Sequence, residues 1–133
     1  LFSKEMTRFL IDVDEAIDLI FKGLSYDQVS IIPKSKSLKI LDLFEIFKEN
    51  FNLKFNIGYP RIGEKIHEVL VSKEEITRLS NSDCGTFYIL KPSIIKLQSV
   101  STQLREDDYS SKDCLISKSE LNTILEKYNY FKP

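Results

Sequence analysis

Three short segments of the chain place apolar residues at helical spacing, and short β-branched runs lie between them. Within 14–24 the apolar side chains recur every three or four residues, which is typical of a helix that buries one face. The same spacing recurs in 37–50 and again after Ser117. No apolar run approaches the roughly 18 residues that a membrane-spanning helix needs. The pattern therefore favours a mixed fold of short helices and short strands, with no membrane contact.

Four helices are predicted, each with a side chain that can cap its first turn. Their expected spans are 14–24, 37–50, 72–79 and a segment from Ser117 onward, with N-caps at Asp12 or Asp14, Ser37, Ser72 and Ser117.

Four short strands are predicted from β-branched, aromatic or alternating residues. They are expected at 28–33, 53–57, 67–72 and 86–90. The weakly patterned segment 93–108 is expected to be mostly loop, and 109–133 to form a C-terminal segment with a helix. The sequence thus predicts an α+β (mixed α/β) chain of about four helices and four short strands, in a single domain over 1–133.

The charge balance excludes several classes of partner. The 133 residues carry 19 basic and 20 acidic side chains, for a net charge of −1. This leaves no basic footprint for nucleic acid and none for a membrane surface. Two cysteines and a single histidine cannot complete a zinc site without carboxylates, so free thiols in a reducing cytoplasm are expected. Because the sequence opens on Leu1, we expect a fragment, a processed product or the ordered part of something longer.

No motif for a self-sufficient active site is present. The chain lacks a glycine-rich phosphate loop, a nucleophile elbow and a paired-histidine metal motif. Tyr128 and Lys132 have the spacing of a reductase pair, but they end the chain and no cofactor fold precedes them. We therefore expect no catalytic residue and no metal ligand in these residues.

Three motifs carry a resemblance to a known family. They are MTRF followed by DEAIDLI (6–20), GYPRIGEKIHE (58–68) and DDYSS (107–111). In this order they resemble the C-terminal part of the CapD-like nucleotide-sugar 4,6-dehydratases and epimerases of capsular polysaccharide biosynthesis. These enzymes are extended short-chain dehydrogenase/reductases, and the resemblance runs from about Met6 to Tyr130.

The resemblance implies a division of labour. In the family an N-terminal Rossmann half binds NADP or NAD and carries the catalytic residues, whereas the C-terminal part binds the nucleotide end of a UDP-N-acetylhexosamine. It implies that the Rossmann half is absent from these residues, that no cofactor binds to this chain alone, and that the chain is inactive alone. A separately encoded Rossmann half, a full-length relative or another copy of the chain is the partner expected.

The resemblance also implies five substrate-binding residues. Arg8 and Arg61 would contact the diphosphate, which a planar guanidinium can hold through two hydrogen bonds. Glu64 would accept from ribose hydroxyls or hold Arg61 in place, and the second role is favoured. Tyr109 would stack or hydrogen-bond, and Ser110 would donate to a phosphate. As alternatives, Arg8 pairs with Glu5 or Asp12 on the surface, and Arg61 with Glu64 forms an ordinary loop ion pair.

The predicted function follows from this match. The chain would be the UDP-sugar-binding portion of a UDP-N-acetylglucosamine 4,6-dehydratase or epimerase, acting in the cytoplasm on precursors of capsule or O-antigen. The alternative is a non-catalytic UDP-sugar-binding, regulatory or interaction domain left from a truncated enzyme.

Overall fold

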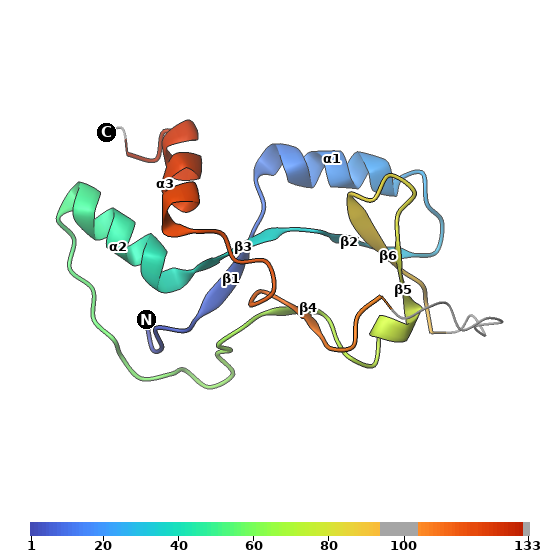
Figure 1. Ribbon diagram of the computed structural model, residues 1–133, viewed down its shortest axis with the longest axis horizontal. Coiled ribbons are helices and arrows are strands. Elements are labelled where there is room, and N and C mark those ends of the chain that lie inside the picture. The colour runs from blue at the N-terminus through green and yellow to red at the C-terminus, as the bar shows by residue number, and fades with distance from the viewer. Residues whose placement is uncertain (94–103, 132–133) are drawn as a thin grey trace. The chain divides into compact units, whose positions relative to one another are not determined.

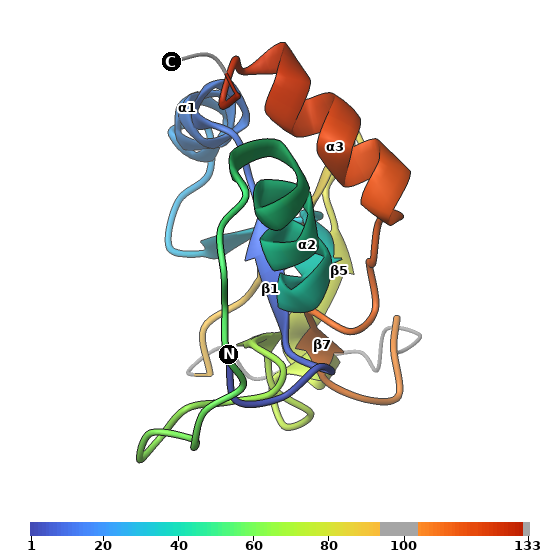
Figure 2. The same ribbon diagram turned by 90° about the vertical axis from the view of Figure 1, so that its left-hand side faces the viewer.

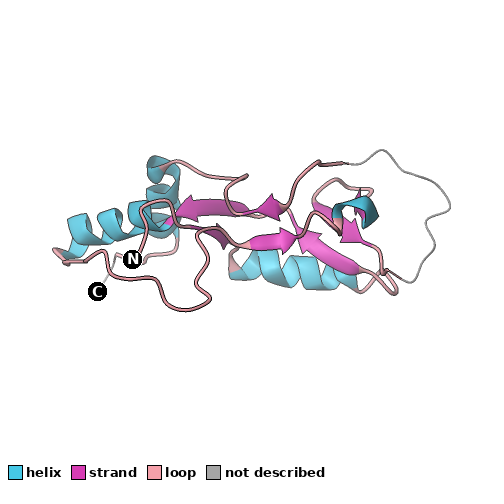
Figure 3. Cartoon of the chain, turned by 90° about the horizontal axis from the view of Figure 1, so that it is seen from below, coloured by secondary structure: helices cyan, strands magenta, loops and turns pink. Residues whose placement is uncertain are grey.

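The computed structural model describes residues 1–93 and 104–131 (Figure 1). Among these residues the chain forms three α-helices, one short 3-10 helix and seven short strands, joined by long loops (Figure 3). This confirms the predicted α+β class. The strands are β1 (Thr7–Leu10), β2 (Ser30–Pro33), β3 (Lys36–Lys39), β4 (Val69–Val71), β5 (Leu79–Asn81), β6 (Phe87–Leu90) and β7 (Tyr109–Ser110). The helices are α1 (Val13–Gly23), α2 (Ile40–Phe51), η1 (Ile76–Arg78) and α3 (Lys118–Lys127).

The chain divides into two compact units, each assembled from separate segments. The first contains Leu1–Leu10, Lys36–Glu68 and Ser111–Pro133, and the second contains Ile11–Ser35 and Val69–Ser110. The predicted single domain over 1–133 stays a prediction. Most of the predicted loop 93–108 lies outside the described residues, and its described part, 104–108, contains neither helix nor strand.

The first unit packs two helices against a two-stranded sheet. β1 pairs antiparallel with β3, and α2 follows β3 directly. Figure 2 shows α2 and α3 side by side, and the buried side chains between them form the core of this unit. That core consists of Leu38, Ile46, Leu121 and Leu125. Ser117 caps α3 as predicted, because its hydroxyl accepts from the Glu120 backbone N–H at 3.2 Å.

The second unit contains a three-stranded antiparallel sheet in the order β2-β6-β5 and a separate pair, β4 with β7. α1 lies alongside β2 (Figure 1), where a Cβ added at Gly23 would meet Ile31 at 3.5 Å. The Asp12 side chain caps α1 in a full capping box with Glu15. The apolar stripe of α1 faces solvent instead of a core, with Phe21 66% and Leu24 77% exposed.

Several predicted elements were placed wrongly. Ser37, the predicted N-cap, is fully buried inside β3, and α2 begins at Ile40 without a side-chain cap. The Ser37 backbone bonds to Cys114 and Ile116, residues far along the chain, and this pairing takes precedence over its capping tendency. No strand forms at 53–57, and the predicted helix 72–79 is reduced to the single turn η1.

Candidate functional site

The loop 58–66, which carries the predicted binding residues Arg61 and Glu64, is anchored at both ends to the N-terminal segment of the first unit. The Gly58 N–H donates to the Leu1 carbonyl at 2.7 Å, and the Thr7 N–H donates to the Ile66 carbonyl at 2.9 Å. Gly63 adopts a left-handed backbone with φ of 82°, which glycine reaches without steric cost. The middle of the loop is exposed, so its side chains are open to a ligand.

Glu64 holds the backbone of Arg61 within this loop. The Glu64 Oε2 atom accepts from the Arg61 backbone N–H at 3.3 Å, and the Glu64 N–H donates to the Arg61 carbonyl at 3.0 Å. Among the described residues the Arg61 guanidinium has no hydrogen-bond or ion-pair partner, and the residue is exposed. The loop therefore presents an open, fork-shaped cation on a fixed backbone. Contact of either residue with a nucleotide stays a prediction.

Arg8 lies at the other end of the anchored loop, and its guanidinium is largely occupied. Nη1 donates to the carbonyls of Thr7 at 2.7 Å and Ile66 at 3.3 Å, and Nη2 donates to that of Lys65 at 3.0 Å. Nε lies 3.3 Å from the Glu68 carboxylate, and the Arg8 side chain is 26% exposed. The ion-pair alternative had named other partners, but Arg8 does pair with a carboxylate. Its geometry ties 65–68 to β1.

A buried hydroxyl network lies beside Arg8, and the sequence reasoning did not single it out as a site. Thr7 Oγ1 lies 2.8 Å from His67 Nδ1 and 2.6 Å from Ser111 Oγ. Ser111 Oγ also accepts from the Glu68 backbone N–H at 2.9 Å. The three side chains come from three different motifs of the resemblance, and only that shared origin could have linked them in the sequence.

Tyr109 and Ser110, the other two predicted binding residues, form β7 in the second unit. Tyr109 is 1% exposed, and its hydroxyl donates to the carbonyls of Pro33 at 3.3 Å and Ser35 at 3.4 Å. Its ring meets the edge of Tyr88 at a centroid distance of 5.4 Å. Ser110 is also buried. The structure thus groups Arg8, Arg61 and Glu64 in one unit, and contact of Tyr109 and Ser110 with a nucleotide stays a prediction.

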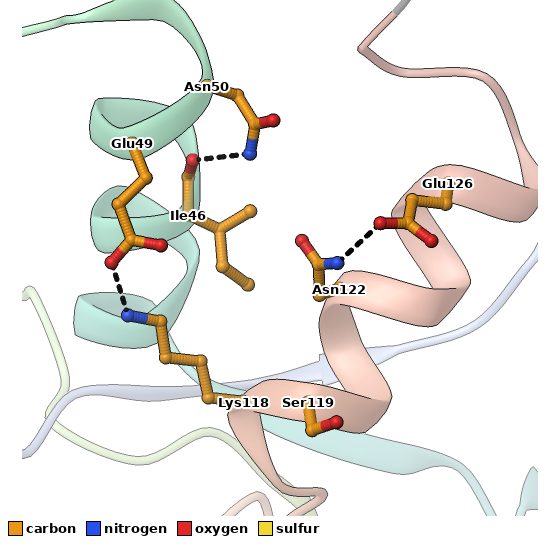
Figure 4. A pocket seen from close by; sticks show the side chains of 7 residues that line it. All are labelled: Ile46, Glu49, Asn50, Lys118, Ser119, Asn122 and Glu126. Atoms are coloured by element: carbon orange, nitrogen blue, oxygen red, sulfur yellow. Dashed lines mark hydrogen bonds and ion pairs between the residues drawn. The ribbon is translucent and has the colours of Figure 1, made fainter.

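One pocket of about 550 Å³ lies between α2 and α3 of the first unit (Figure 4). Lys118 reaches from α3 to Glu49 at 2.9 Å and Glu45 at 3.0 Å, and these hydrogen bonds raise the pKa of its ammonium. None of the five predicted binding residues lines this pocket. Its lining consists of Ile46, Glu49, Asn50, Lys118, Ser119, Asn122 and Glu126.

Cys84, in the second unit, has a thiol whose pKa is lowered by its neighbours. Hydrogen bonds from the hydroxyls of Ser82, at 3.5 Å, and Thr86, at 3.0 Å, lower its pKa to about 7. The side chain is exposed, and both cysteines are free thiols. Among the described residues no group of three or more histidine, cysteine or acidic side chains could hold a metal ion. Within the same residues, every helix is too short or too polar to cross a membrane.

Comparisons with known proteins show which family and which relatives the chain resembles. A family model described as polysaccharide biosynthesis protein matches residues 1–92. The chain is 28% identical over 140 residues to an uncharacterized membrane protein of Methanocaldococcus jannaschii, which covers 95% of this chain and 40% of that protein. It is 32% identical over 91 residues to a UDP-N-acetylglucosamine 4,6-dehydratase (inverting) of Campylobacter jejuni, which covers 67% of this chain and 26% of that enzyme. It is also 33% identical over 87 residues to a UDP-glucose 4-epimerase of Rickettsia bellii, over 62% of this chain and 25% of that enzyme.

A solved structure agrees at the level of the fold. The X-ray structure of Pen from Bacillus thuringiensis superposes with a TM-score of 0.77 at 20% sequence identity. The match covers 96% of this chain and 40% of that one, so this chain spans well under half the length of the proteins that it matches. The family model covers more than half of the chain, and two of the relatives are named as nucleotide-sugar enzymes. The chain therefore belongs to the polysaccharide biosynthesis protein family, as the C-terminal part of a CapD-like extended short-chain dehydrogenase/reductase.

Proposed function

We propose that this chain binds the nucleotide end of a UDP-N-acetylhexosamine for a UDP-N-acetylglucosamine 4,6-dehydratase or epimerase. The enzyme would act in the cytoplasm on precursors of a surface polysaccharide such as capsule or O-antigen. The role of the chain is positioning: it orients the sugar toward a reacting centre that other residues supply. The observation that supports this most directly is the exposed guanidinium of Arg61, which has no partner among the described residues, on an anchored loop.

The chemistry of a diphosphate fits that observation. A diphosphate is doubly anionic and has paired oxygens, which a guanidinium can hold through two parallel hydrogen bonds. Glu64 fixes the Arg61 backbone, and Arg8 fixes the far end of the loop through the carbonyls of Lys65 and Ile66. Less conformational freedom is therefore lost when a ligand binds to this loop. In this proposal Arg8 also adds positive charge beside the diphosphate.

Tyr109 and Ser110 enter the proposal through β7. This strand pairs with β4, which directly follows the 58–68 motif in the chain. Since both residues are buried, their proposed contribution is to hold that strand pair, and a contact with the nucleotide would require β7 to open.

The cofactor of such enzymes, NADP or NAD, does not fit the residues described here. A dinucleotide fold needs parallel strands joined by helices, with a glycine-rich turn at the pyrophosphate. The paired strands among the described residues are antiparallel, apart from one isolated bridge between Ser37 and Leu115. We propose that the cofactor binds to a Rossmann half, as the predicted partner of this chain.

The alternative is a non-catalytic, UDP-sugar-binding or regulatory domain. The exposed apolar stripe of α1 favours a partner polypeptide in either case, because a monomeric protein rarely leaves such a stripe open. The chain spans 40% of the length of the relatives that match nearly all of it. A Rossmann half, separately encoded or in a full-length relative, is therefore the partner that we propose.

Titration of the chain with UDP tests the proposed function. We expect Arg61→Ala to weaken UDP binding roughly ten- to a hundredfold, because a charge-assisted hydrogen bond contributes about 1.5–3 kcal/mol. Arg61→Lys should recover only part of this, since an ammonium lacks the fork. Lys54→Ala removes an exposed cation of the same unit and serves as the control. Equal UDP affinity in all four proteins would contradict the proposal.

A further inference from the structure

A network of hydrogen bonds ends at the only histidine of the chain. Thr7 is 1% exposed and Ser111 is fully buried, whereas His67 is half-buried. Thr7 Oγ1 contacts His67 Nδ1 at 2.8 Å and Ser111 Oγ at 2.6 Å. His67 lies 60 positions and Ser111 104 positions from Thr7 in the sequence, so the fold alone brings the three residues together.

The distances assign a direction to this network. Ser111 has one hydroxyl hydrogen, and it can be given either to Thr7 Oγ1 at 2.6 Å or to the Thr7 carbonyl at 3.2 Å. The Thr7 carbonyl, which can accept two hydrogen bonds, also accepts from Arg8 Nη1 at 2.7 Å, so the choice rests on the contact between the two hydroxyls being the shorter one. The shorter contact favours donation from Ser111 to Thr7, and the Thr7 hydroxyl then donates to His67 Nδ1. A backbone N–H, which can only donate, starts the series at Ser111.

This direction fixes the protonation of the imidazole ring. Nδ1 accepts from Thr7, so the neutral ring carries its hydrogen on Nε2. Nε2 has no hydrogen-bond partner among the described residues. It is also absent from the fully buried side-chain atoms that lack a partner, so Nε2 is at least partly exposed. Nε2–H is therefore an oriented donor that solvent can reach. His67 follows directly after Ile66, whose carbonyl bonds the loop 58–66 to β1.

We propose that His67, in the 58–68 motif, is an additional anion-binding residue. Its Nε2–H donates to a phosphate oxygen of the ligand. Thr7 and Ser111 are its positioning residues, because they set the tautomer and hold the ring. The identity of the ligand as a nucleoside diphosphate rests on the proposed function, but the donor geometry does not. A ring held by a buried partner loses little rotational freedom on binding, so its hydrogen bond contributes most of its strength to affinity.

Because His67 is the only histidine, its ring signals in nitrogen-15 NMR are unambiguous. At a pH above the ordinary titration range of histidine, we expect the Nε2–H tautomer in the free chain. Thr7→Ser keeps the hydroxyl and should keep this tautomer, whereas Thr7→Val removes the hydroxyl and should mix the two tautomers. An Nδ1–H tautomer in the unmodified chain, or no change in Thr7→Val, would overturn the proposal.

Binding is tested with inorganic pyrophosphate and UDP, followed at the same ring signals. The signal from Nε2 should move with both probes. The amide of Gln can replace Nε2 and that of Asn can replace Nδ1. We therefore expect His67→Asn to weaken pyrophosphate binding about tenfold and His67→Gln to keep it within about threefold. Loss of thermal stability without any loss of affinity would mean a structural histidine only.

The two probes separate this inference from the proposed function. If UDP moves the signals of the Arg61 loop but not the ring of His67, the proposed function stands and this inference falls. If pyrophosphate moves the ring signals but UDP binds no more tightly than pyrophosphate, the anion contact is supported and recognition of the nucleotide is contradicted. If neither probe moves the ring signals, the inference is overturned, because phosphate oxygens were then available and did not bind at Nε2.

Discussion

At the residue scale, the two arginines of the matched motifs have opposite surroundings. Arg8 donates to three carbonyls and pairs with Glu68, so its guanidinium is part of the framework of the first unit. Arg61 has its backbone held by Glu64 and its side chain open. The same residue type is thus a structural tie at position 8 and an exposed cation at position 61. The difference arises from the number of carbonyl oxygens within reach of each.

Removal of the Arg8 side chain should destabilise the first unit. Arg8→Ala removes the guanidinium hydrogen bonds to three carbonyls and the ion pair with Glu68, and we expect a loss of about 1–3 kcal/mol in the free energy of unfolding. Arg8→Lys should recover little, because one ammonium cannot match the fork. Urea unfolding measures this, with Lys22→Ala as the control, since Lys22 forms only an exposed pair with Asp18. A full recovery in Arg8→Lys would contradict the role of the fork.

Cys84 should react as a thiolate at a lower pH than an ordinary thiol. Its pKa is about 7 because the Ser82 and Thr86 hydroxyls stabilise the thiolate, whereas an unperturbed thiol titrates at roughly 8.5. In a Cys114→Ser background, the alkylation rate with iodoacetamide should therefore reach half its maximum near pH 7. Thr86→Val removes one hydroxyl and should move this midpoint upward. An unchanged midpoint would mean that the hydroxyls do not set the pKa.

At the element scale, the helices differ in how they use their apolar faces. α2 and α3 bury theirs against each other and β3, whereas α1 has no buried residue. The capping box at Asp12 stabilises the first turn of α1, and Gly23 lies close to β2, where an added Cβ would meet Ile31 at 3.5 Å. The stripe left open on α1 is the reason to expect a partner polypeptide.

The packing of α2 against α3 predicts a large effect of a single core residue. Leu121 is fully buried among Leu38, Ile46 and Leu125. Leu121→Ala should therefore lower the free energy of unfolding by about 2–5 kcal/mol through lost burial and the cavity that remains. Leu53→Ala removes the same atoms from an exposed position and should cost less than about 0.5 kcal/mol. Thermal unfolding compares the two variants, and similar losses would contradict this packing.

At the scale of the whole molecule, the chain is two compact units with an open apolar helix face and an open cationic loop. Neither feature amounts to a reaction centre. The relatives named as dehydratase and epimerase are matched over 26% and 25% of their length. The open helix face and the open loop agree with the proposal that this chain binds and positions a ligand.

The purified chain should therefore not convert UDP-N-acetylglucosamine with added NADP or NAD, even when it binds UDP. We expect the catalytic residues in a Rossmann half, because a dinucleotide site needs parallel strands and the named strands of the described residues pair antiparallel. Product analysis by mass spectrometry measures this. A full-length family member, assayed in the same way, serves as the positive control. Turnover by the chain alone would contradict the proposed division of labour.

The local patterns of the sequence determined the features that depend on near neighbours. Helical spacing and the caps at Asp12 and Ser117 predicted α1 and α3 closely, because a first turn is stabilised by residues within four positions. The order of the three motifs was also sufficient to identify the family. The bonds between Arg61 and Glu64 are also local, since these residues are three apart, whereas the bonds that anchor their loop to Leu1 and Thr7 are not.

Only the tertiary structure decided the pairings between distant residues. Ser37 has the side chain of a helix cap, but strand pairing with residues near 115 buried it. Tyr109 was predicted to contact a ligand, yet carbonyls 74 and 76 residues away accept from its hydroxyl. The network of Thr7, His67 and Ser111 spans up to 104 positions. Strand register and buried hydrogen bonds depend on which distant groups meet, and no local pattern in one sequence encodes that meeting.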